Sequence, residues 1–150
     1  MSDSASKPRL LLPALQPFYD RITPLAWPLV RCATGLILAV HGWGKVTKGA
    51  EAFVPTFAKL GFEPAILVFW TLLVVEFVGG ICLALGLLTR FWAAAITIEM
   101  LVIVNLYLPA GFSWLARGYE YALLWGLVSL AIWIKGGGEY SLDRKIGVEL

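Results

Sequence analysis

The chain has 150 residues, of which 59% are hydrophobic and only 15% are charged, and its formal net charge is +2. Soluble domains carry about 25% charged residues, so this composition argues against an ordinary soluble domain and indicates a membrane protein. The small net charge does not favour a nucleic-acid partner. The two cysteines, Cys32 and Cys82, have no CxxC spacing and belong to no Cys/His cluster, so no metal site is expected.

Four apolar stretches predict four membrane-spanning helices, because a crossing needs roughly 20 residues, with a range of about 17 to 25. Only Thr89 and Arg90 separate the second from the third, which predicts a tight helical hairpin in which Thr89 caps the third helix. The predicted fold is all-α, an antiparallel bundle of four transmembrane helices within residues 25–134. The expected spans, in chain order, are residues 25–43, 65–88, 91–108 and 119–134.

The segment 44–64 is the one sizeable loop on the side opposite the chain ends. Phe53, Phe57 and Leu60 recur in it at helical spacing, which predicts a short amphipathic helix that starts or bends near Pro55. Two interpretations stay open for this helix. It is either a connector resting on the membrane surface or a lid over the mouth of the bundle.

The distribution of positive charge predicts the orientation. With four spans, the segments 1–24 and 135–150 lie on one side of the membrane, together with the turn at Arg90. That side carries more lysine and arginine than the other, which favours the cytoplasm for both chain ends. Its positive residues are Lys7, Arg9, Arg21, Arg90, Lys135, Arg144 and Lys145, against Lys45, Lys48, Lys59 and Arg117 on the opposite side.

Each expected span contains at least one ionisable residue, and a charge near the bilayer centre costs about 3 kcal/mol or more. Such residues are expected to face one another inside a bundle or to line a polar cavity. Close approach of the helices is made easier by small residues four apart, Gly35 with Ala39 and Gly80 with Ala84. The ionisable residues are Arg31 and His41 in the first span, Glu76 in the second, Glu99 in the third and Glu120 in the fourth.

Depths counted from the midpoint of each span, at about 1.5 Å per residue, predict a polar layer near the membrane midplane. In this layer Arg31 faces Glu76, either as a structural ion pair that fixes helix register or as a pair linked to a proton or substrate. Glu99 is a candidate proton relay. It is expected to be protonated or to face a neighbouring protomer.

A second predicted layer lies about 10 Å further out and contains His41, Lys45, Asn105 and Glu120. A quinone headgroup needs hydrogen-bond donors at its carbonyl oxygens and an apolar slot for its tail. Histidine, lysine and a protonated carboxyl can supply those donors, and histidine titrates near neutral pH. These four residues are therefore the candidate quinone or ligand site, and no catalytic residue is assigned.

Short motifs spread over most of the chain resemble those of the DoxX family of bacterial membrane proteins. They begin with Arg31, Gly35 and His41-Gly42-x-x-Lys45, followed by Gly61 with Pro64. The remaining motifs are Glu76-x-x-Gly79-Gly80, Gly86-x-x-Thr89-Arg90, Tyr119-Glu120 and Gly138-x-Tyr140-Ser141-Leu142-Asp143.

The resemblance implies a four-helix bundle in the bacterial inner membrane. It also implies an accessory role in quinone-linked systems, since DoxX- or DoxD-like subunits take part in thiosulfate:quinone oxidoreduction. His41 is the only histidine, which excludes bis-histidine haem within one chain. No covalently bound cofactor is expected, so redox chemistry would need quinone or a partner protein. The alternatives are a non-enzymatic membrane scaffold for partner proteins and a transporter of protons or small solutes. A homo-oligomer is an open alternative for the assembly.

Overall fold

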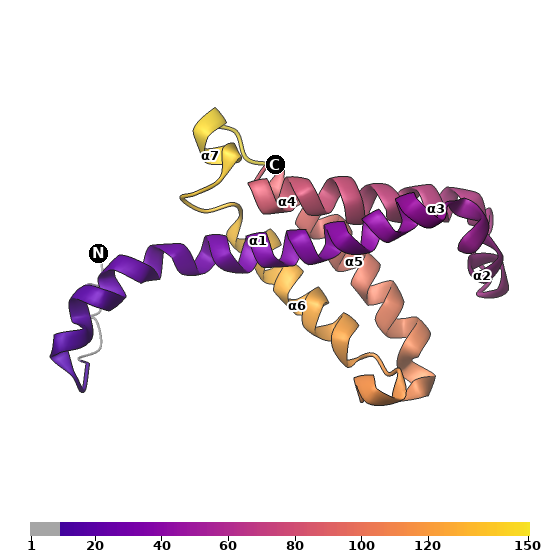
Figure 1. Cartoon of the computed structure of the whole chain (residues 1–150), viewed down its shortest axis with the longest axis horizontal. Coiled ribbons are helices and arrows are strands. Elements are labelled where there is room, and N and C mark those ends of the chain that lie inside the picture. The colour runs from indigo at the N-terminus through magenta and orange to yellow at the C-terminus, as the bar shows by residue number, and fades with distance from the viewer. Residues whose placement is uncertain (1–9) are drawn as a thin grey trace, which may run out of the picture.

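The computed structural model describes residues 10–150, and within this range the chain forms helices joined by turns (Figure 1). The all-α fold class is confirmed. The long helices are α1 (Gln16–Lys48), the continuous rod made of α3 (Ala65–Leu73), the π-helix η3 (Val74–Gly79) and α4 (Gly80–Leu85), then α5 (Thr89–Tyr107) and α6 (Glu120–Lys135). The shorter elements are η1 (Pro13–Leu15), η2 (Ala50–Ala52), α2 (Val54–Lys59), η4 (Leu108–Ala110), η5 (Trp114–Ala116) and α7 (Leu142–Ile146).

Three helical stretches are long and apolar enough to cross a membrane, namely Pro13–Lys48, Ala65–Leu85 and Thr89–Ala110. The fourth expected span coincides with α6, which has 16 residues and is therefore about 24 Å long. The hydrocarbon core of a bilayer is about 30 Å thick. The crossing by α6 consequently stays a prediction.

Helix α1 begins at Gln16, well before the expected start of the first span at residue 25. Pro24 and Pro28 lie inside this helix. The sequence pattern predicts instead that the helix begins directly after Pro24. A proline removes one backbone hydrogen bond and bends a helix, and here the helix continues through both residues. Most of the segment expected to precede the bundle is therefore part of α1, while residues 1–9, with Lys7 and Arg9, lie outside the described residues.

Glycines let α1 lie directly against the α3–η3–α4 rod. A Cβ atom on Gly35 would overlap the backbone of Gly80 and Ala84, and one on Gly80 would overlap the backbone at Ala39. One on Gly42 would overlap Phe77. The close approach expected from the small residues is confirmed. Because Gly35 meets the α4 end of the rod and Gly42 the η3 end, the two elements run in opposite directions.

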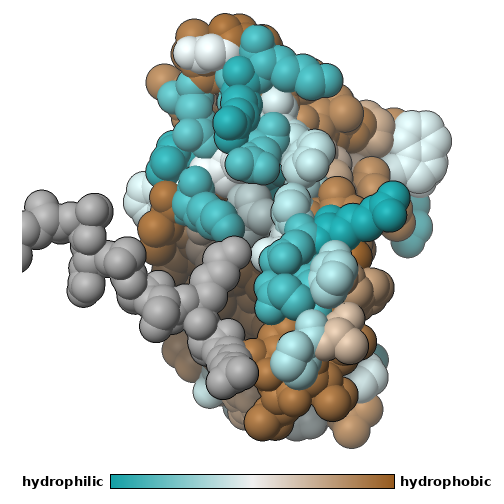
Figure 2. Space-filling view, turned by 90° about the vertical axis from the view of Figure 1, so that its left-hand side faces the viewer, coloured by the Kyte–Doolittle hydropathy of each residue, from teal (hydrophilic) through white to brown (hydrophobic). Residues whose placement is uncertain are grey.

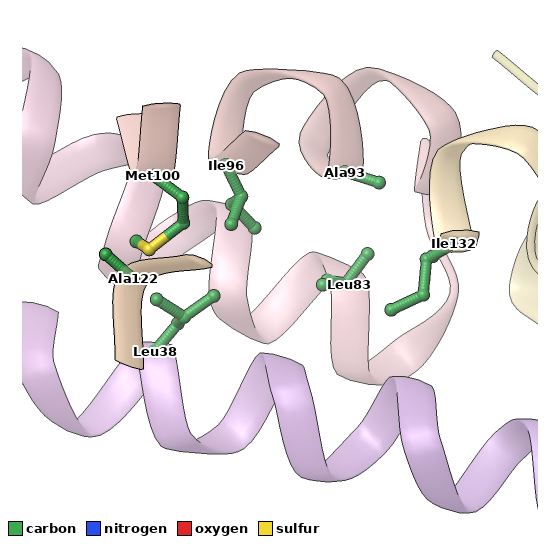
Figure 3. Close-up of a cluster of buried hydrophobic side chains, with 7 residues drawn as sticks. All are labelled: Leu38, Leu83, Ala93, Ile96, Met100, Ala122 and Ile132. Carbon is green, nitrogen blue, oxygen red and sulfur yellow. The ribbon is translucent and has the colours of Figure 1, made fainter. Parts of the chain in front are cut away.

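Helices α5 and α6 form the second pair, and the apolar core lies where the two pairs meet (Figure 3). Gly126 of α6 would place a Cβ 3.2 Å from the Cβ of Met100 on α5. Leu38 from α1 and Leu83 from α4 pack into the same cluster, so all four long elements contribute to it. Its members are Leu38, Leu83, Ala93, Ile96, Met100, Ala122 and Ile132.

The two pairs diverge away from this core. In Figure 1 the start of α6 lies well apart from α2 and α3, whereas the end of α6 and the turn between α4 and α5 lie together on the side of α7. The end that faces the viewer in Figure 2 carries a concentration of hydrophilic residues bordered by hydrophobic ones. The helices are thus gathered at one polar end and spread at the other.

The loop between α1 and α3 contains the short helix expected from its sequence. Helix α2 starts at Val54 and has Pro55 in its first turn, a position where the missing N–H of proline costs nothing. The Phe53 ring packs on that of Phe69, with 6.0 Å between centroids, and Phe69 is fully buried. The loop is therefore held against the rod by aromatic packing.

Candidate functional site

Two separate groups of charged and polar side chains are buried in this protein. The first, here called the tail clasp, comprises Arg31, Thr89 and Asp143 at the end of the molecule near α7. The second, the carboxyl cluster, comprises Lys45, Glu76 and Glu99 further along the helices. Their hydrogen bonding differs, and that difference identifies the candidate site.

Asp143 caps helix α5 from a distant part of the chain. Its Oδ1 accepts the Leu88 N–H at 2.7 Å, and its Oδ2 accepts both the Thr89 N–H at 2.9 Å and the Thr89 hydroxyl at 2.6 Å. A carboxylate at a helix N-terminus pairs with free N–H groups and with the helix dipole. The expected capping by Thr89 is wrong: Thr89 is the first helical residue and itself donates to Asp143.

Arg31 holds the C-terminal segment against α4. Its Nη1 donates to the carbonyl of Leu83 at 2.9 Å and its Nη2 to the carbonyl of Tyr140 at 2.7 Å. The expected ion pair between Arg31 and Glu76 is wrong, because Arg31 faces the end of α4, about two turns or ~10 Å from Glu76. The depth of Arg31 is estimated from the midpoint of the expected span 25–43. That midpoint is wrong because α1 extends far beyond this span.

Glu76 instead pairs with Lys45. The Lys45 Nζ lies 2.5 Å from Glu76 Oε2, and the two side chains are only 11% and 9% exposed. Glu76 lies in the π-helix η3, a wider helical turn that occurs mostly as a local feature and often at functional sites. The sequence predicts Lys45 in the outer layer and Glu76 at the midplane, but the two belong to the same buried group.

Glu99 adds a second buried carboxyl to this pair. Only 6% of the residue is exposed. Within the described part of the chain, neither carboxyl oxygen accepts a hydrogen bond. Glu76 is close enough to hydrogen-bond with it once one of the two carboxyls carries a proton, and Lys45 is near enough to act on it electrostatically. Two adjacent buried carboxylates are not both ionised at low cost. Within the cluster, Lys45 supplies one positive charge beside these two carboxyls.

The loop after α1 covers one side of this cluster. The Lys45 ammonium lies 5.7 Å from the centroid of the Phe53 ring, within the range of a cation–π contact. Phe53 is in turn packed on buried Phe69. Both interpretations of the loop, connector and lid, place it at this end of the helices, and the contact with Lys45 favours a cover.

The remaining residues of the expected outer layer are not drawn together. His41 and Asn105 are exposed, and Glu120 accepts a hydrogen bond from the Trp114 N–H at 3.1 Å. Among residues 10–150, no hydrogen bond joins any two of His41, Lys45, Asn105 and Glu120. The physical reason is the divergence of the two helix pairs, which separates the start of α6 from α3 (Figure 1).

No group of three or more His, Cys, Asp or Glu side chains in residues 10–150 could hold a metal ion. The pocket of about 310 Å³ along α5 and α6 is formed by apolar residues together with Thr97. Its α5 residues Ala94, Thr97 and Leu101 lie roughly opposite Glu99, at about 140° to 160° around the helix, so this pocket does not open onto the carboxyl cluster.

Comparison with known proteins places these features in a family context. Residues 26–109 match the family model described as DoxX. The chain is 30% identical over 130 residues to an uncharacterized protein of Haemophilus influenzae, an alignment that covers 84% of this chain and 94% of that protein. No solved structure matches. The matched range includes all three residues of the carboxyl cluster, whereas Asp143 lies beyond it.

Proposed function

The chain belongs to the DoxX family and is a membrane protein, and on that premise we propose that it is an inner-membrane subunit of a quinone-linked oxidoreductase system. The carboxyl cluster would exchange protons with the quinone. The observation that carries this proposal is Glu99, whose two oxygens are buried inside membrane-length helices without a donor, beside Glu76. An ionisable residue inside a membrane segment is by default a functional candidate.

Quinone chemistry needs what this cluster contains. Reduction of a quinone to a quinol takes up two electrons and two protons, one at each carbonyl oxygen. The Lys45 ammonium and a protonated carboxyl of Glu76 or Glu99 are hydrogen-bond donors for such oxygens, and Glu99 is the group able to give or take a proton. The electrons would come from a partner protein with its own redox centre, so this chain would be an accessory subunit.

The four-span topology is part of this proposal. Trp27 and Arg31 lie near the start of the membrane part of α1. Trp27 donates to the carbonyl of Gly136, and Arg31 donates to that of Tyr140. Those bonds hold the start of the first span and the segment after α6 at the same end of the molecule, as four crossings require. The excess of positive residues at that end supports a cytoplasmic location for both chain ends.

The test is the quinone content of the protein purified in mild detergent from bacterial membranes, in the wild type and in three variants: Glu99→Gln, Glu120→Gln and His41→Ala. We expect near-stoichiometric quinone in the wild type and in Glu120→Gln, and at least a tenfold loss in Glu99→Gln. Loss in Glu120→Gln or His41→Ala with retention in Glu99→Gln would move the site to the outer residues. Absence of quinone from folded wild-type protein would refute the redox assignment.

A scaffold role is the second candidate, and the hydrophilic end of the molecule favours it (Figure 2). That end presents the exposed charges of Glu139, Arg144 and Lys145 to soluble partners. Binding of a partner that survives Glu99→Gln but is lost when Arg144 and Lys145 are both changed to alanine would support the scaffold. Uptake of protons into liposomes containing the protein, abolished by Glu99→Gln, would instead identify a transporter.

A further inference from the structure

Helix α1 is longer than a membrane requires. Its 33 residues extend about 50 Å, against about 30 Å of hydrocarbon. The bundle reaches only as far as Trp27, which bonds to the Gly136 carbonyl and lies under the Lys135 ammonium at 4.3 Å. Residues 16–26 lie beyond that level, and every one of them is exposed. This extension projects from the rest of the molecule in Figure 1.

The extension has an apolar stripe with nothing packed on it in the described structure. At 100° per residue, its members all lie within about 60° of Ile22. Asp20 and Gln16 lie on the other side of the helix, joined by a hydrogen bond of 2.9 Å. The stripe continues without a break into exposed residues of the membrane-spanning part, where lipid covers it. Its residues are Leu15, Phe18, Ile22, Leu25 and Leu29, continued by Leu36 and Val40.

Two prolines bend this helix toward the stripe. Pro24 and Pro28 lie about 120° to 160° around the helix from Ile22. A proline ring crowds the carbonyl four residues earlier and opens the helix on its own side. The helix therefore bends away from the prolines, which is toward the apolar stripe. Figure 1 shows the N-terminal part of α1 curving out of line with the remainder.

We propose that residues 16–26 form an interfacial helix that lies on the membrane surface, at the same side as α7, with the apolar stripe sunk into the boundary between headgroups and acyl chains. Its partner is the bilayer lipid itself. Three features support this assignment: continuity with the lipid-covered face, two prolines placed to bend the helix toward the stripe, and charged residues that lie outside the stripe. The charged residues are Asp20 and Arg21, about 160° and 100° around the helix from Ile22. An amphipathic helix with these properties binds lipid interfaces through its apolar face.

The experiment uses the full chain with Cys32 and Cys82 replaced by alanine and one new cysteine at a time. Phe18→Cys and Leu25→Cys report on the stripe, and Asp20→Cys is the matched control on the opposite flank. Each protein is labelled with an environment-sensitive fluorophore and placed in phospholipid vesicles. We expect headgroup-level nitroxide lipids to quench the two stripe positions at least twofold more than position 20, and aqueous iodide to show the reverse order.

Two results would overturn the proposal. Equal and strong iodide quenching at all three positions would show that the extension projects into water. Protection of positions 18 and 25 from both quenchers, accompanied by disulfide crosslinking between copies of Phe18→Cys, would show that a second copy covers the stripe. A variant with Pro24 and Pro28 changed to alanine provides a further check, since straightening the helix is expected to lower lipid quenching at position 18 by at least half.

Discussion

The tail clasp and the carboxyl cluster both bury charged groups, yet the hydrogen bonding of their carboxylates is opposite. Asp143 receives three donors at 2.6 to 2.9 Å. Arg31 donates to two backbone carbonyls, although its Nε has no acceptor among the described residues. In the carboxyl cluster, Glu76 has Lys45, whereas both oxygens of Glu99 are left without a donor in the described residues. The Asp143 carboxylate is thus already occupied by donors, whereas the Glu99 carboxyl is free to accept one from a ligand.

The contrast separates architecture from chemistry within one molecule. Buried polar groups that are fully hydrogen-bonded make a structure rigid, whereas an unsatisfied buried group in a native protein requires a specific explanation. On this view the tail clasp holds the fold together. Under the proposed function, the carboxyl cluster is the place where a proton or a ligand would be exchanged. Four substitutions test that division, beginning with the one expected to destabilise most.

Asp143→Ala is expected to have the largest effect on stability. It removes the acceptor of three hydrogen bonds and leaves the amides of Leu88 and Thr89 unpaired, at a cost of about 4 kcal/mol. Thermal unfolding in detergent, followed by tryptophan fluorescence, measures the loss. Asp20→Asn is the matched control, because Asp20 is exposed, and it is expected to change stability by less than about 0.5 kcal/mol. Equal stability of the two variants would show that the clasp does not hold the fold.

Lys45→Met is expected to cost about 3 kcal/mol, because it leaves the buried Glu76 carboxylate without its counter-ion. The double variant with Glu76→Gln removes both charges and is expected to recover all but about 1 kcal/mol of that loss. The same thermal unfolding assay applies to the two single variants and the double variant. Additive losses would mean that Lys45 and Glu76 contribute independently, contrary to the ion pair in the structure.

Gly42→Ala tests the close contact that positions the cluster. The added Cβ would overlap the backbone of Phe77, next to Glu76, and overpacking of this kind costs about 2 kcal/mol. Gly44→Ala is the control in the same helix, since no atom lies within 4 Å of its Cβ position, and it is expected to be neutral within about 0.5 kcal/mol. A neutral Gly42→Ala would argue against the helix register described above.

Glu99→Gln is expected to have the smallest effect on stability, because glutamine keeps the shape of the side chain and Glu99 has no donor to lose among the described residues. It removes the group that we propose exchanges protons. Its unfolding temperature should match that of the wild type although quinone content falls. The informative comparison is therefore between two measurements on one variant. A loss of stability as large as that of Asp143→Ala would assign Glu99 to the architecture and remove the distinction between the two groups.

The sequence allowed correct prediction of features that depend on local pattern. Helical class, the short helix starting near Pro55 and the close approach at Gly35 and Gly80 all follow from periodicity, proline chemistry and side-chain size. The burial of carboxyls such as Glu99 within the bundle could also be inferred, because a charge is costly in hydrocarbon.

Pairing between helices could not be predicted in the same way. The partner of Arg31 depends on how far α1 slides along the neighbouring rod, and hydropathy does not report that offset because Pro24 and Pro28 masked the true start of the helix. Asp143 belongs to one of the motifs that resemble the DoxX family, but an aspartate in a polar tail is ordinarily solvated. Its burial depends on a tertiary contact with Leu88 and Thr89 that no local pattern encodes.

The capping of α5 by Asp143 also constrains the order in which the protein can be completed during synthesis. Leu88 is translated 55 residues before its hydrogen-bond acceptor, and at roughly 5 to 20 residues per second that interval is about three to eleven seconds. During this time the amides of Leu88 and Thr89 lack this acceptor. The segment that carries Asp143 therefore completes the cap of α5 only after all the long helices have been made, and a chain that stopped before residue 143 would leave the turn between α4 and α5 uncapped.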